Sequence, residues 1–163
     1  MKRGLVLGKF MPLHNGHIEM INFAKTKCDK VVILLCAEAS EPIDAMTRVK
    51  FINDVFGQDD NIEINYMSYS AFQLSPSSDY EETETKKWAD RIASYNFNLD
   101  VIISSEEYGK HLARFMEIDY IDYDIDRQKI PISATEIRKN PYKNWDKIPD
   151  TVREYYYKKM FKE

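Results

Sequence analysis

Two histidines, His14 and His17, stand three residues apart directly after a short apolar run. On the opening turn of a helix, this spacing places both imidazoles on one face. Gly16 removes a side chain at a point where a ligand would come close to the backbone, and Pro12 stiffens the turn. A helix start also supplies N–H groups and a partial positive charge, so these residues predict a phosphate-binding site.

Two histidines at this spacing also occur as surface residues or as two metal ligands. The position after the first predicted strand, with Lys9 just before the pair, favours phosphate. The chain has five glycines, and neither G-x-G-x-x-G nor G-x-x-x-x-G-K-[ST] occurs in it. The usual dinucleotide fingerprint and the P-loop are therefore absent, and the histidine segment stands in their place.

A second polar cluster lies at Ile132–Arg138, with the sequence ISATEIR. Ser133 and Glu136 have the spacing of a capping box, which is a purely structural interpretation of the cluster. Thr135 and Arg138 would add a hydroxyl and a guanidinium to the same helix start, which makes it a second anion-binding element. If the two helix starts face each other, together they can hold a triphosphate.

Apolar runs and helix-period segments alternate along the chain, which predicts where these clusters lie. The expected strands cover residues 4–8, 31–36, 62–66, 101–103 and 118–123, with helices over 18–28, 44–57, 88–95 and 108–115. This order predicts an α/β fold: a doubly wound, mostly parallel five-stranded sheet with helices on both faces and a ligand site at the carboxyl ends of the strands. The polar segment Met67–Tyr80 is a candidate substrate lid.

The composition fits one domain over residues 1–163, since 44% of the residues are hydrophobic and 31% are charged. A net charge of -4 argues against a broad nucleic-acid surface. No apolar run approaches the roughly 20 residues that span a bilayer, and no signal peptide is recognisable, so we expect a cytoplasmic protein without membrane contacts. Cys28 and Cys36 are not in a C-x-x-C spacing and are expected to be buried thiols.

The segments GKFMPLHNGH and ISATEIR resemble the paired signature motifs of the nucleotidyltransferase superfamily, whose HxGH and ISxTxIR elements bind ATP phosphates. The turn Ser104–Glu106 and the segment that continues from ISATEIR resemble the nicotinamide mononucleotide adenylyltransferase domain of bacterial NadR proteins. This resemblance implies a Rossmann-like nucleotidyltransferase fold. The implied reaction transfers the adenylyl group of ATP to nicotinamide mononucleotide, giving NAD and pyrophosphate, with Mg²⁺ accompanying the ATP.

The resemblance also implies roles for particular residues. His14 and His17 would be the catalytic residues, with His17 donating to the α-phosphate, and no residue is expected to be a dedicated metal ligand. The implied ATP-binding residues are Lys9, Phe10, Gly16, Ser105, Ser133, Thr135 and Arg138. Trp88 would stack on nicotinamide, with a core aromatic residue as the alternative, and Arg48 would meet the acceptor phosphate, with an exposed helix arginine as the alternative.

Other functions remain open at this point. One alternative is another small transferase that uses phosphopantetheine or flavin mononucleotide as acceptor, or CTP as donor. Another is a domain that senses NAD or ATP without turnover. NadR proteins usually continue into a kinase domain with a P-loop, which this sequence lacks, so the chain is either a free-standing adenylyltransferase or a fragment. The sequence does not determine the oligomeric state or the preference between nicotinamide and nicotinic acid mononucleotide.

Overall fold

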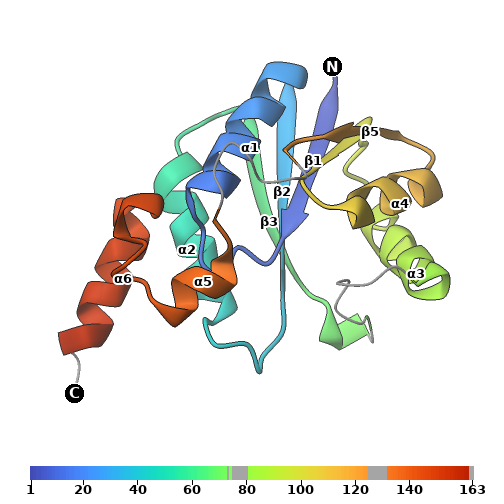
Figure 1. Ribbon diagram of the computed structural model, residues 1–163. Helices are drawn as coiled ribbons and strands as arrows, with labels where there is room; N and C mark the ends of the chain where they lie inside the picture. The colour runs from blue at the N-terminus through green and yellow to red at the C-terminus, as the bar shows by residue number, and fades with distance from the viewer. Residues whose placement is uncertain (73, 75–80, 125–131, 162–163) are drawn as a thin grey trace.

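A five-stranded sheet lies at the centre of the computed structural model, which describes residues 1–72, 74, 81–124 and 132–161 (Figure 1). The strands are β1 (Arg3–Gly8), β2 (Lys30–Ala37), β3 (Ile62–Ser68), β4 (Val101–Ser104) and β5 (Asp119–Asp122). Their order across the sheet is β3-β2-β1-β4-β5, and every neighbouring pair is parallel. The carboxyl ends of all five strands therefore meet at one edge of the sheet.

The direction of winding reverses at β1. The chain first builds outward through β2 and β3, then returns to the other side of β1 for β4 and β5. In a doubly wound sheet, the crevice for a ligand opens where the strand order reverses, outside the carboxyl ends of the strands. Here that place lies beyond Gly8 of β1 and Ser104 of β4.

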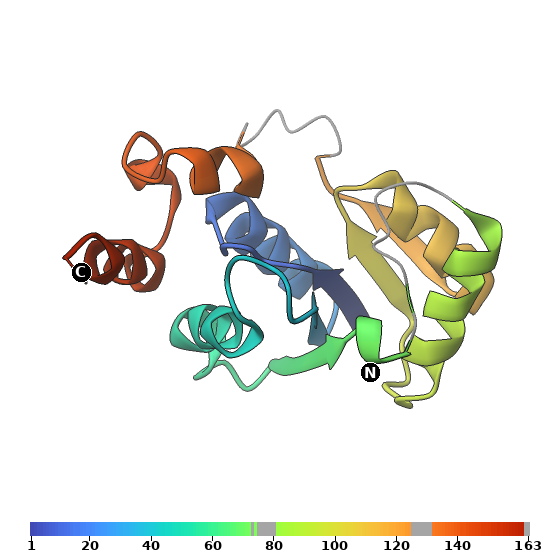
Figure 2. The ribbon, with the colours of Figure 1, turned by 90° about the horizontal axis from the view of Figure 1, so that it is seen from below.

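Helices cover both faces of the sheet (Figure 2). The α-helices are α1 (Asn15–Lys27), α2 (Ala45–Phe56), α3 (Glu82–Ala93), α4 (Glu107–Met116), α5 (Ala134–Lys139) and α6 (Asp150–Phe161), and two 3₁₀ helices are η1 (Ser70–Phe72) and η2 (Trp145–Lys147). Helices α1 and α2 pack on one face together with α5 and α6, whereas α3 and α4 pack on the other. The expected doubly wound α/β fold is confirmed.

Strand β2 is apolar at every position from Val31 to Ala37, and its packing shows why. Val31 and Ile33 face the core under α1 and α2, while Val32 and Leu34 face the core under α3 and α4. Side chains alternate between the faces of a strand, so a strand covered on both sides must be apolar at successive positions.

Local signals place several helix ends correctly. Asp44 is the N-cap of α2 and accepts a hydrogen bond from the backbone N–H of Thr47, and Gly57 is its C-cap. Some strand ends differ from the expected ones. β3 continues to Ser68 instead of ending at residue 66, and β5 covers Asp119–Asp122 instead of residues 118–123. These ends carry no turn signal in the sequence.

The candidate lid is described only in part, because residues 73 and 75–80 lie outside the described residues. In the described part, Tyr69 and Leu74 are buried in the core under α3 and α4. Ser70–Phe72 between them are exposed, so the described part of the segment is anchored in the core at Tyr69 and Leu74, and its role as a lid stays a prediction. Within the same described ranges, no helix is both long enough and apolar enough to cross a membrane.

Candidate active site

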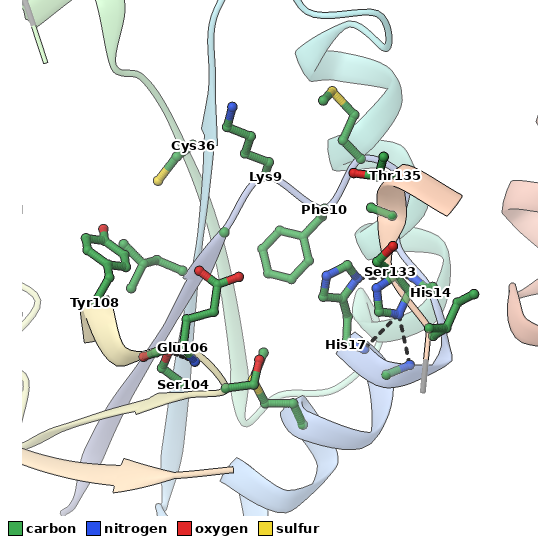
Figure 3. Close-up of a pocket in the computed structure, with 18 of the residues that line it drawn as sticks. Lys9, Phe10, His14, His17, Cys36, Ser104, Glu106, Tyr108, Ser133 and Thr135 are labelled. Atoms are coloured by element: carbon green, nitrogen blue, oxygen red, sulfur yellow. Dashed lines mark hydrogen bonds between the residues drawn. The ribbon is translucent and has the colours of Figure 1, made fainter. Parts of the chain in front are cut away.

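A cavity of about 460 Å³ opens at the carboxyl ends of β1 and β4, between the starts of α1 and α5 (Figure 3). All candidate residues from the sequence except Arg48 line it: Lys9, Phe10, His14, Gly16, His17, Trp88, Ser105, Ser133, Thr135 and Arg138. The expectation that the two helix starts face each other across the strand ends is confirmed. Residues more than 100 positions apart in the chain share one cavity.

The two histidines cap helix α1 and hold each other in place. His14 is the N-cap, and its Nδ1 accepts from the backbone N–H groups of Gly16, at 3.0 Å, and His17, at 3.4 Å. In return, Nδ1 of His17 accepts from the backbone N–H of His14 at 3.2 Å. The rings are stacked with their centroids 3.7 Å apart. Because each Nδ1 accepts, the N–H of each ring in its neutral form is on Nε2.

This geometry corrects two details of the sequence interpretation. His14 is not on the opening turn of the helix but at the N-cap, one position before α1 begins. The backbone N–H groups of Gly16 and His17 were expected to bind phosphate, yet they donate to the His14 ring. These two backbone N–H groups are therefore used within the cap of the helix.

Gly16 is needed to accommodate the His14 ring. A Cβ at this position would lie 2.8 Å from Cε1 and 3.0 Å from Nδ1 of His14, and the ring is buried. The close approach that the glycine permits here is that of a side chain of the cap. Its contact with phosphate stays a prediction.

We expect Gly16→Ala to destabilise the protein by about 1 to 2 kcal/mol, because the new methyl group must push the His14 ring out of its cap. An ordinary helix position would instead gain up to about 1 kcal/mol from this change, so the sign of the effect is diagnostic. Chemical denaturation measures it. Gly8→Ala is the matched control, since a Cβ there meets only the Phe10 ring at 3.6 Å or beyond. Equal stability of the two variants would contradict the prediction.

Phe10 lies between strand β1 and the histidines in a backbone conformation that disfavours large side chains. Its φ is 48°, in the left-handed region, which costs of the order of 1 to 3 kcal/mol for a residue other than glycine. The ring is buried, and its contact with the His17 ring is edge-on, with the centroids 4.9 Å apart. The strained turn thus places an aromatic wall against the second imidazole.

Lys9 is paired with an acidic residue that the sequence analysis did not single out. Its ammonium lies 2.8 Å from Oε2 of Glu41, in the loop between β2 and α2. Partial burial lowers the pKa of Lys9, but the hydrogen bond and the charge of Glu41 outweigh it and hold that pKa above its ordinary value. Nothing in the local sequence distinguishes Glu41 from a surface acid, because its partner is 32 positions away.

Arg48 is the one candidate that the structure does not bring to the cavity. Its side chain is completely buried, so the alternative of an exposed helix arginine is also wrong. The guanidinium donates to Oε1 of Glu41 and to the carbonyl oxygen of Lys9, each at 3.0 Å. These two bonds use the arginine inside the protein, and we no longer assign it to the acceptor phosphate.

The ISATEIR segment forms the opposite wall. Ser133 is the N-cap of α5 and accepts from the backbone N–H of Glu136 at 3.2 Å, as the capping interpretation predicts. Arg138 donates to the carbonyl oxygen of Met11, in the loop before the histidines, and lies 3.5 Å from the Thr135 hydroxyl. The arginine therefore joins the two motifs directly.

The third wall is the turn after β4. Ser104 accepts from the backbone N–H of Glu106 at 2.9 Å, and the Tyr120 hydroxyl donates to the carbonyl oxygens of both residues. Ser105 and Tyr108 also line the cavity. The contact of Ser105 with adenosine stays a prediction, and Tyr108 was not singled out in the sequence.

Trp88 of α3 belongs to the core and also reaches the cavity. It is 2% exposed, and its ring lies against Tyr69, with centroids 5.7 Å apart. Tyr69 and Cys36 line the same wall, and both were missed as cavity residues. Burial raises the pKa of the Cys36 thiol to about 12, so the sulfur is protonated at neutral pH. The expectation of buried thiols holds for Cys36, whereas Cys28 is half-buried.

A parallel sheet with polar donors from two helix starts around a cavity at its switch point defines a nucleotide-binding α/β protein. Comparison with known families is more specific, since residues 5–140 match the cytidylyltransferase-like family, and the chain belongs to that family.

Two curated relatives cover most of the chain. A nicotinamide-nucleotide adenylyltransferase of Thermococcus kodakarensis is 28% identical over 163 residues, which are 95% of this chain and 82% of the relative. The trifunctional NAD biosynthesis/regulator protein NadR of Escherichia coli is 28% identical over 172 residues, which are 94% of this chain. The alignment covers 40% of that longer protein, so the chain spans about two fifths of its length.

Among solved structures, a NadR protein in complex with NR is similar with a TM-score of 0.74. The similarity covers 93% of this chain and 44% of that one, at 22% sequence identity. At this identity the comparison concerns the fold, and it confirms the Rossmann-like arrangement of the sheet and helices.

Proposed function

We propose that this protein transfers the adenylyl group of ATP to nicotinamide mononucleotide, giving NAD and pyrophosphate. The observation that carries the proposal is that the His14–His17 pair and the start of α5 line one cavity and are joined by the bond from Arg138 to the Met11 carbonyl. The names of the relatives support the acceptor.

The proposed reaction needs no general base. A phosphate oxygen of the mononucleotide, already ionised at neutral pH, attacks the α-phosphorus of ATP, and the bond from that phosphorus to the bridging oxygen of pyrophosphate breaks. Catalysis then consists of positioning and charge stabilisation. His14 and His17 donate from Nε2 to phosphate oxygens, with His17 on the α-phosphate, where negative charge builds in the transition state.

Cations and hydroxyls complete the phosphate site. Lys9 and Arg138 neutralise the β- and γ-phosphates from opposite walls, and Ser133 and Thr135 supply further donors at the start of α5. Phe10 and Gly16 shape the turn that carries the histidines. These assignments follow the motifs of the family and the position of each side chain around the cavity.

We also propose that Mg²⁺ enters with ATP. The residues present fit such an ion, since the carboxylates of Glu106 and Asp124 line the cavity and oxygen is the preferred donor for Mg²⁺. When bound, the ion neutralises charge on the departing pyrophosphate. In the part of the chain that the structure describes, no three His, Cys, Asp or Glu side chains are grouped as a metal site.

The acceptor ring is placed against the aromatic wall. A pyridinium ring is flat and positively charged, and an aromatic side chain attracts it by stacking and by a cation–π interaction. Trp88 is the proposed contact, and Tyr69 lines the cavity beside it. The cytoplasmic location and the single domain over residues 1–163 stay predictions.

A pyrophosphate-release assay with several acceptors tests the function. We expect release with ATP and nicotinamide mononucleotide, little with flavin mononucleotide or phosphopantetheine, and little when CTP replaces ATP. Calorimetry on the same samples measures nucleotide binding. ATP or NAD binding without any release of pyrophosphate would support the sensing alternative, and release with another acceptor would assign a different transferase. Nicotinic acid mononucleotide in the same assay determines the preference between the two pyridine acceptors.

A further inference from the structure

Glu41 lies behind the cavity wall and contacts two residues that line it. Its Oε2 accepts from the Lys9 ammonium at 2.8 Å and from the Tyr69 hydroxyl at 3.1 Å. Its Oε1 accepts from Arg48 at 3.0 Å and from the backbone N–H of Glu38 at 2.9 Å. Its side chain is 8% exposed. Each oxygen is therefore held by two donors, which fixes the carboxylate in one orientation.

The same group fixes the backbone of Lys9. Arg48 donates to the Lys9 carbonyl oxygen, and Glu41 accepts from the Lys9 ammonium. The Glu41–Arg48 ion pair therefore holds both the main chain and the side chain of Lys9. The next residue is Phe10, whose strained φ of 48° must be maintained by its surroundings. Two cations share one carboxylate here, and only Lys9, with a side chain 44% exposed, presents its charge to the cavity.

Tyr69 extends the group to the aromatic wall. The Lys9 ammonium lies 5.7 Å from the centroid of the Tyr69 ring. The centroid of the Trp88 ring lies 5.7 Å from that of the Tyr69 ring. Glu41 therefore connects Lys9, at the cationic end of the cavity, with Tyr69 in its aromatic wall.

We propose that Glu41 is a positioning residue that acts through Lys9 on ATP and through Tyr69 on the acceptor, although it does not line the cavity itself. This inference rests on the proposed function for the acceptor, but its ATP half can be measured by binding alone. Glu41 keeps the Lys9 ammonium charged and at the cavity wall, where a phosphate can share it.

The charges around the pair determine its dependence on pH. Four groups face Glu41: Lys9 after β1, Arg48 from α2, Tyr69 after β3 and the thiol of Cys36 on β2. Without the carboxylate, the two largest contributions that raise the pKa of Lys9 would be lost, so this pKa would fall. The ammonium would then lose its proton, and its attraction for phosphate, at a lower pH than in the wild type.

Glu41→Gln tests the proposal, with Asp44→Asn as the matched control. Asp44 is an acid of the same loop that caps α2, and asparagine caps equally well, so the control removes one charge without touching Lys9. Calorimetry should give an ATP affinity about ten- to a hundredfold weaker for Glu41→Gln, as expected when a charge-assisted hydrogen bond is lost. The loss should grow as the pH rises from neutral to about 10, near the ordinary pKa of lysine. The control should match the wild type.

Three further variants separate the contributions. In the double variant Glu41→Gln with Lys9→Arg, the loss of ATP affinity should no longer increase with pH, because a guanidinium stays protonated in this range. Tyr69→Phe should raise the KM of the acceptor several-fold and leave ATP affinity unchanged. If Glu41→Gln does not fold because buried Arg48 loses its partner, Glu41→Gln with Arg48→Gln removes both buried charges and should show the same dependence on pH.

Wild-type ATP affinity in Glu41→Gln at every pH, or an equal loss in Asp44→Asn, would overturn the proposal. A pH-dependent loss that persists with Lys9→Arg would also overturn it, because Lys9 would not be the group that responds. If the wild type binds ATP with the expected dependence on Glu41 but forms no NAD, the proposed function fails while the role of Glu41 toward Lys9 stands. Absence of ATP binding in the wild type would overturn both.

Discussion

Replacing His17 by alanine should lower kcat for NAD formation by about two to three orders of magnitude, the range found when one transition-state donor is removed. Its Nδ1 accepts from the His14 backbone, and the proposed mechanism uses the Nε2–H as the donor to the α-phosphate. Steady-state rates with both substrates saturating measure the effect. His111→Ala is the matched control, because His111 lies on α4 and is not among the residues that line the cavity, and it should keep wild-type kcat.

His17→Asn distinguishes catalysis from capping. The amide oxygen of asparagine can accept from the His14 N–H, as Nδ1 of His17 does, but the shorter side chain has no donor at the position of Nε2. We expect its melting temperature to stay near that of the wild type while kcat falls as in the alanine variant. If His17→Asn has both the melting temperature and the kcat of the wild type, His17 acts only through the cap.

Trp88→Ala should destabilise the protein by about 3 to 5 kcal/mol, because a buried aromatic ring packed on Tyr69 would leave a cavity in the core. Trp88→Phe refills much of that space and isolates the effect on binding. We expect it to raise the KM of nicotinamide mononucleotide several-fold and to leave the KM of ATP unchanged, as loss of ground-state binding to one substrate requires.

Fluorescence gives a second measurement of the same contact. The chain has two tryptophans, and Trp145 stacks on Tyr142 away from the lining residues of the cavity. In a Trp145→Phe background all tryptophan emission comes from Trp88, and the mononucleotide should quench it. If the phenylalanine variant raises both KM values together and lowers the melting temperature, Trp88 is only a core residue.

Most of the fold could be predicted because its causes are local. A strand covered on both faces must be apolar at successive positions, which the residues of β2 are, and the caps Asp44 and Gly57 mark the ends of α2 by their own chemistry. The order of the strands has no local cause. It depends on which strand pairs with β1 on its second side, and the pairing of Gly4 with Val101 joins residues 97 positions apart.

The same distinction between local and long-range causes applies to the residues of the site. The phosphate-binding motifs are contiguous in sequence, so their residues could be proposed together and do line one cavity. The capping by His14 and His17 has a local signal, since two side chains that can accept hydrogen bonds at positions i and i+3 are the pattern of a capping box. Glu41 and the true role of Arg48 had none, because each is defined by partners on other elements.

The bond from Arg138 to the Met11 carbonyl joins two segments of the cavity wall that lie 127 positions apart in the chain. One wall comes from the segment around β1 and the other from α5, whose Ile137 is buried in the core that α1 also covers. Asn15 of α1 donates to the carbonyl oxygen of Asp146 in η2, which follows α5 in the chain. Contacts between segments this far apart are expected to form late in folding. A nucleotide that touches both walls would bind only the docked form, so we expect it to stabilise the position of α5 by mass action. Amide hydrogen exchange in α5 should therefore slow when the cavity is occupied, which would make the stability of this six-residue helix depend on the bound ligand.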